Sequence, residues 1–171
     1  MQNEIIYSKN VLEFAAVASE SCTFFERANA FERKDFVERL LKLLPLIYLK
    51  TSMLPYVETD FDDESERFVS ENEYESVRQN IVRLLGQFDN YLEVVPGSEE
   101  VSALSIGEDI ADIYQELKDF SENYQLGVED AMESGLSAVV SAFTEHWGQK
   151  LLNALKALHY LLYNEDLSND D

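Results

Sequence analysis

Apolar residues recur at steps of three and four along almost the whole chain, which is the spacing of one face of an α-helix. Five segments carry this pattern, at about residues 4–29, 34–53, 70–95, 105–126 and 128–163. No stretch alternates apolar and polar residues for long enough to predict a β-strand. The pattern therefore predicts an all-α fold, a single-domain antiparallel helical bundle of about five helices.

Local signals mark where some of these helices begin or bend. Ser70 is followed by Glu73, and Ser105 by Glu108, and both pairs fit the capping box, in which each side chain satisfies the other residue's backbone N–H. Pro45 lies inside the second segment, where it removes a backbone donor and disfavours helix at the preceding residue. We therefore expect the second helix to be kinked or broken at Pro45.

The chain of 171 residues has the length of one domain. We expect a helical domain over residues 1–164, with an acidic linker at 58–69 and an acidic tail at 165–171. The linker spaces its acids like an EF-hand loop, but Ser65 stands where the sharp turn of that loop requires glycine. Residues 58–67 are therefore predicted to be a mobile linker that binds no ion.

Charge and cysteine content restrict the partners and the compartment. Thirty-four acids against thirteen bases give a net charge of -21, which repels phosphate backbones and anionic lipids. We expect no nucleic-acid partner and no membrane partner. Cys22 is the single cysteine, so no disulfide forms within the chain, and the first ten residues do not resemble a signal peptide. A cytoplasmic location follows as an expectation.

Several segments together resemble a known family: YSKNVLEF, LLKLLPLIYLK, LLGQFDNYLEVV, DIADIYQELKDF and WGQKLLNALKALH. This is an uncharacterised all-helical bacterial family, most common in gut Bacteroidetes, that is classified as a domain of unknown function. The similarity spans nearly the whole chain, and the last two segments are its most specific part. The resemblance implies a helical fold and a cytoplasmic setting, and it assigns no catalytic residue.

Four acids of segment 105–126 form the candidate metal site. Asp109, Asp112, Glu116 and Asp119 fall within a stripe about 80° wide on one helix, beside its apolar face. Aligned carboxylates next to an interhelical groove suit Mg²⁺, which prefers oxygen ligands. Facing acids are offered by neighbouring segments, namely Asp89, Glu93, Asp130 and Glu133. The alternative interpretation is a solvated acidic face, which the helix dipole favours near the helix start.

Residues near Trp147 form the second candidate site. Gly148 follows Trp147 in mid-helix, where glycine costs about 1 kcal/mol relative to alanine, so we expect a packing reason such as close approach of another helix. Lys150 is expected to pair with acids of segment 105–126, because bases are scarce in this chain. We predict that Trp147, Lys150, Asn153 and His159 are the residues best placed to contact a ligand.

The sequence contains no phosphate-binding loop and no nucleophile motif. The preferred hypothesis is therefore a non-enzymatic helical interaction module that needs no cofactor and binds a protein partner, or itself as a homo-oligomer. Nine Tyr and ten Phe residues supply aromatic side chains, some of which we expect to be exposed. The alternative hypothesis is a Mg²⁺-dependent nucleotide phosphohydrolase that uses the carboxylates of segment 105–126.

Overall fold

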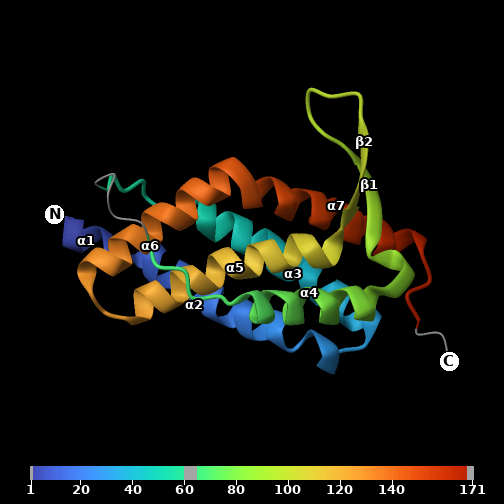
Figure 1. Cartoon of the computed structure of the whole chain (residues 1–171), viewed down its shortest axis with the longest axis horizontal. Coiled ribbons are helices and arrows are strands. Elements are labelled where there is room, and N and C mark those ends of the chain that lie inside the picture. Colours follow the sequence, from blue (N-terminus) through green and yellow to red (C-terminus); the bar gives the residue numbers. More distant parts are fainter. Residues whose placement is uncertain (1, 60–64, 169–171) are drawn as a thin grey trace.

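The computed structural model describes residues 2–59 and 65–168 (Figure 1). Its helices are α1 (Gln2–Ile6), α2 (Lys9–Glu26), α3 (Arg33–Ser52), α4 (Glu71–Leu85), α5 (Ile106–Gln125), α6 (Glu129–Ala142) and α7 (Gly148–Asn164). Shorter elements are the 3₁₀ turns η1 (Ala28–Ala30) and η2 (Gly86–Phe88), the π-helical turn η3 (Phe143–Trp147), and the strands β1 (Asn90–Val94) and β2 (Val101–Ser105). The predicted all-α single domain is confirmed, with one small hairpin added to it.

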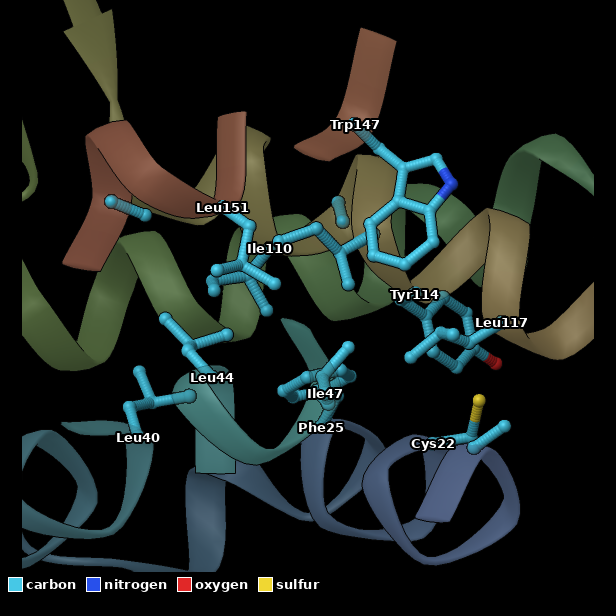
Figure 2. Packing of buried hydrophobic residues seen from close by; sticks show 14 of the residues in the cluster. Cys22, Phe25, Leu40, Leu44, Ile47, Ile110, Tyr114, Leu117, Trp147 and Leu151 are labelled. Carbon is cyan, nitrogen blue, oxygen red and sulfur yellow. The ribbon is translucent and has the colours of Figure 1, made fainter. Parts of the chain in front are cut away.

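Helix α5 lies at the centre of the bundle. It contacts α2, α4, α6 and α7, while α3 packs against both α2 and α7. Figure 2 shows buried side chains from these layers converging on one core: Cys22, Phe25, Leu40, Leu44, Ile47, Ile110, Tyr114, Leu117, Trp147 and Leu151. Full burial of one such aliphatic or aromatic side chain contributes about 1.5–3 kcal/mol. A single continuous core therefore holds the helices together.

The predicted helix starts are confirmed, and of the two alternatives predicted at Pro45 the helix is not broken, while a kink stays a prediction. Ser70 and Glu73 form both hydrogen bonds of a capping box, and Ser105 Oγ accepts from the backbone N–H of Glu108 at 3.2 Å. Helix α3 continues through Pro45 to Ser52. Pro45 lies on the exposed side of α3, where water can satisfy the carbonyl group that loses its donor.

The hairpin of β1 and β2 corrects two further predictions, the absence of strands and a third helix that continues to residue 95. Helix α4 ends at Leu85 because Gly86 adopts a positive φ of 57°. The strands are antiparallel and are joined by a turn in which Ser98 N donates to Val95 O at 2.9 Å. Pro96 and Gly97, with φ 85° at the glycine, suit the central positions of a type II turn.

The predicted linker at 58–69 is only partly described. Its EF-hand-like positions Asp60, Asp62 and Glu64 lie outside the described residues. Its last residues are held in place, because the backbone N–H groups of Phe68 and Val69 both donate to a carboxylate of α5. These contacts attach the residues just before α4 to α5, and the mobility of residues 58–67 stays a prediction.

The described part of the predicted tail at 165–171 is also attached to the domain. Leu167 is buried, and Ser168 O accepts from Arg33 Nη1 at 3.4 Å. Helix α3 therefore anchors the chain beyond the end of α7. Residues 169–171 lie outside the described residues.

Candidate functional site

Asp109, the first acid of the candidate metal site, is buried with 4% of its surface exposed. Its Oδ2 accepts a hydrogen bond from the hydroxyl group of Tyr91 on β1. Burial disfavours the charged carboxylate and raises the pKa of Asp109 to about 7. The hydrogen bond from Tyr91 and the positive charge of Lys150 act in the opposite direction. Asp109 therefore links the hairpin to α5 as a buried, titratable group.

Asp112 joins three helices. Its Oδ2 contacts Lys150 Nζ of α7, and its Oδ1 accepts from the hydroxyl group of Tyr74 of α4 at 2.6 Å. The Lys150 and Asp112 side chains are 27% and 17% exposed, so this ion pair is partly buried. The predicted pairing of Lys150 with an acid of α5 is confirmed.

Asp119 fixes the segment that precedes α4 onto α5. Its carboxylate accepts from Arg67 Nη1 at 3.1 Å, from Phe68 N at 2.8 Å and from Val69 N at 3.0 Å. Arg67 also contacts Glu116 Oε1 at 3.2 Å. Glu116 and Asp119, two of the four candidate metal ligands, thus both form ion pairs with Arg67. The sequence analysis missed this partner because Arg67 lies far from both acids in the chain.

Two of the four facing acids that we expected at this site, Asp89 and Glu93, are engaged elsewhere. Asp89 accepts from Ser105 Oγ at 2.6 Å and from Gly107 N at 2.7 Å, so it caps the start of α5. Glu93 forms an ion pair with Lys156 of α7 at 3.4 Å. Among the described residues, no three His, Cys, Asp or Glu side chains lie close enough together to hold a metal ion. The geometry favours the four α5 acids as connectors between elements.

Trp147, the first residue of the candidate ligand site, belongs to the core. Its Nε1 donates to Val139 O at 3.2 Å, and its ring packs against Phe143 with centroids 4.7 Å apart. A Cβ atom on Gly148 would lie 2.6 Å from Phe143 O. Gly148 therefore has the packing reason that we expected. The close neighbour is the π-helical turn η3, which directly precedes α7, and not another helix.

The other three candidate ligand residues point to different places. Lys150 faces α5, and Asn153 accepts from Gln149 Nε2 at 2.8 Å. The His159 ring packs on Tyr163 with centroids 4.8 Å apart, on the side of α7 that faces α3. The structure therefore does not bring Trp147, Lys150, Asn153 and His159 into one pocket.

Two grooves flank α7 on its outer side. The α3–α7 groove has a volume of about 810 Å³ and is lined by Glu38, Leu41, Lys42, Leu152, Leu155, Lys156, His159, Leu162 and Tyr163. The groove between β1 and α7 has a volume of about 490 Å³, and its lining includes Phe88, Tyr91, Leu92, Ile106, Ala157 and Tyr160. Lys156 lies between the two grooves and lines both of them.

The outer side of the hairpin is apolar, and we call Leu92, Val94, Val101 and Ala103 the hairpin face. In the strand register Leu92 pairs with Ala103, and Val94 pairs with Val101, so all four lie on one side. Leu92, Val94 and Val101 are 73%, 47% and 61% exposed. Figure 1 shows the hairpin extending away from the helices beside α7.

Comparisons with known proteins agree with this fold. The crystal structure of protein BF1032 from Bacteroides fragilis is similar, with a TM-score of 0.86 and 43% sequence identity over 95% of this chain and 98% of that chain. No curated protein matches the chain. Within the described residues, no helix has both the length and the apolar character needed to cross a membrane. The family model described as "Domain of unknown function (DUF5063)" matches residues 5–164, so the chain belongs to this family.

Proposed function

We propose that this domain is a non-enzymatic interaction module that associates with a second copy of itself through the hairpin face. The observation that carries the proposal is the high exposure of Leu92, Val94 and Val101 on one side of the hairpin. On a sheet with one face packed on the core, the other face is ordinarily polar. An exposed apolar face is therefore a signal for association.

The geometry of the hairpin supports a second copy as the partner. The hairpin face carries no charged side chain, and the acids Glu99 and Glu100 lie in the loop beyond it. A two-fold axis that sets two hairpins antiparallel joins identical faces and keeps the acidic loops apart. Because the hairpin extends away from the bundle, it also separates two strongly acidic bodies. At physiological salt, charges more than about 8 Å apart are largely screened.

The small size of the hairpin face predicts weak and reversible association. Stable interfaces bury about 800 Å² on each partner, which requires roughly 20–30 residues a side. The hairpin face has four residues, with Tyr160 of α7 as an exposed aromatic neighbour in the adjoining groove. A two-stranded hairpin is only marginally stable by itself, so contact with a second copy also stabilises the strands.

The partners of the α5 acids support a non-enzymatic role, and the buried thiol of Cys22 supports a cytoplasmic location. Each acid of the candidate metal site has a hydrogen-bond or ion-pair partner within the domain, which favours a structural role over catalysis. Cys22 is a free thiol whose burial raises its pKa to about 12, so it is unreactive. A cytoplasmic location is part of this proposal, since a single buried thiol suits a reducing compartment.

Sedimentation velocity across a concentration series tests the proposal. We expect the wild-type chain to show a reversible monomer–dimer equilibrium, and the double variant Leu92→Thr with Val101→Thr to remain monomeric. The matched control is Leu12→Thr with Val128→Thr, which removes similarly exposed apolar side chains from other surfaces. A wild-type monomer at every concentration, or a dimer that survives the hairpin substitutions, contradicts the proposal.

A further inference from the structure

We propose that the α3–α7 groove receives an acidic amphipathic helix of a partner protein. This site lies on the other side of Lys156 from the hairpin groove, so it goes beyond self-association through the hairpin face. The argument rests on the length of the groove, its apolar floor and the charges along its edges.

The groove has the dimensions of a short helix. Its α7 side extends from Leu152 to Tyr163, and eleven residue steps in a helix cover about 16 Å, or about three turns. Its α3 side extends from Glu38 to Lys42. A helix that lies along α7 for about three turns therefore contacts α3 over about one turn.

Leucine side chains form the floor of the groove. Leu41, Leu155 and Leu162 are partly buried, and Leu152 is 40% exposed. An amphipathic helix that docks in such a groove inserts apolar side chains spaced at i, i+3 or i+4, and i+7. The floor therefore accepts a helix with leucine-like anchors on successive turns.

Charge complementarity identifies the partner helix as acidic. Lys42 and Lys156 line the groove against one described acid, Glu38, whereas the whole chain has 34 acids and 13 bases. Lys156 contacts Glu93, but the Lys156 side chain remains 76% exposed, so its ammonium group can also pair with an acid of a partner. Among the described residues, Lys42 has no ion-pair partner within 4 Å. The edges of the groove thus present cationic groups on an otherwise acidic protein.

The chain itself does not supply such a helix. Its acidic amphipathic helices α4 and α5 turn their apolar sides into their own core. A second copy therefore has no spare helix of this kind among the described elements, and the occupant comes from a different protein.

Peptide display tests the proposal with the full chain as the target. The library contains helical peptides of about 14 residues, roughly 21 Å long, with leucine fixed at i, i+3, i+7 and i+10. Glu, Lys and Gln are encoded equally at the flanking positions. We expect selection to enrich Glu over Lys at these positions. Fluorescence anisotropy of the enriched peptides should then show a Kd that rises with ionic strength.

Matched variants place the binding in the groove. We expect Leu152→Gln and Lys42→Glu each to weaken peptide binding by about tenfold, a loss of about 1.4 kcal/mol. The control Leu12→Gln on α2 makes the same substitution elsewhere, and Arg83→Glu on α4 makes the same reversal of charge; both should leave Kd unchanged. All four positions are exposed, so circular dichroism melts should show folded proteins throughout.

Four outcomes overturn the proposal. They are the absence of enriched peptides, enrichment of basic or uncharged flanks, binding that neither groove variant weakens, and self-association that Lys42→Glu abolishes. The last outcome assigns the groove to a second copy of the chain. The hairpin variant Leu92→Thr with Val101→Thr should keep peptide binding, which separates this result from the proposed self-association.

Discussion

The hydroxyl group of Tyr91 on β1 donates a hydrogen bond to the buried carboxyl group of Asp109 on α5. This contact fastens the inner side of the hairpin to the central helix. Because successive side chains of a strand point to opposite sides, the same attachment turns Leu92 outward. The exposure of the hairpin face is therefore a consequence of how the hairpin is anchored.

The first prediction concerns the titration of Asp109. Its pKa is about 7 in the folded chain, against 3.8 for a free side chain, because burial disfavours the carboxylate. Between these values the folded protein keeps a proton that the unfolded chain releases. Rising pH therefore favours unfolding through this window, with a total loss of at most about 4 kcal/mol.

Urea unfolding at a series of pH values measures this effect. The variant Asp109→Asn cannot titrate at this position, so its stability relative to the wild type should rise between pH 4 and pH 7 and level off above that range. Comparing the two proteins cancels the titration of the other acids. A stability difference that stays constant across the window contradicts the prediction.

The second prediction concerns the donor in the same contact. Tyr91→Phe removes the hydroxyl group and leaves Asp109 without this partner, which should lower the free energy of unfolding by about 1–3 kcal/mol. Tyr160→Phe is the control, because Tyr160 is 57% exposed on α7. Urea unfolding of both variants checks the difference. If Tyr91→Phe is as stable as Tyr160→Phe, the contact with Asp109 does not stabilise the fold.

The predictable parts of the fold depend on local sequence. Steps of three and four locate the helices, and Ser70 with Glu73 marks a helix start, because both signals act within a few residues. The pairing of Lys150 with Asp112 was also predictable, since scarce bases in an acidic chain are placed against acids.

The features that the sequence analysis missed depend on tertiary contacts. The hairpin was missed because Leu92 and Val101 are apolar yet face solvent, which removes the expected alternation of apolar and polar residues. The attachment of Asp119 to Arg67 joins residues 52 positions apart, and no local pattern signals it. Side-chain spacing therefore located the acids but not their partners Arg67 and Tyr91.

The third prediction tests the π-helical turn before α7. Gly148→Ala should destabilise the protein by about 1–3 kcal/mol, because the added Cβ meets Phe143 O at 2.6 Å and the interior is tightly packed. Helix propensity alone predicts the opposite, a gain of about 1 kcal/mol. Ser141→Ala at an exposed site of α6 is the control in a thermal melt. A stabilised Gly148→Ala variant means that the turn relaxes to a regular helix.

The last prediction distinguishes structural from metal-binding carboxylates on α5. The double variant Asp112→Asn with Glu116→Gln removes the negative charges that face Lys150 and Arg67 while keeping the shape of both side chains. We expect a loss of about 1–2 kcal/mol, less than for a fully buried pair because all the partners are partly exposed. Relief of like-charge repulsion at i and i+4 offsets only a few tenths of a kcal/mol.

Thermal unfolding with and without Mg²⁺ checks this prediction. The control is Glu129→Gln with Asp130→Asn in the exposed first turn of α6, which removes the same number of charges from the chain. If the α5 acids act as connectors, the double variant is less stable than the wild type by the same amount in both conditions. A wild-type stabilisation by Mg²⁺ that the double variant loses, but the control retains, assigns these acids to a metal ion instead.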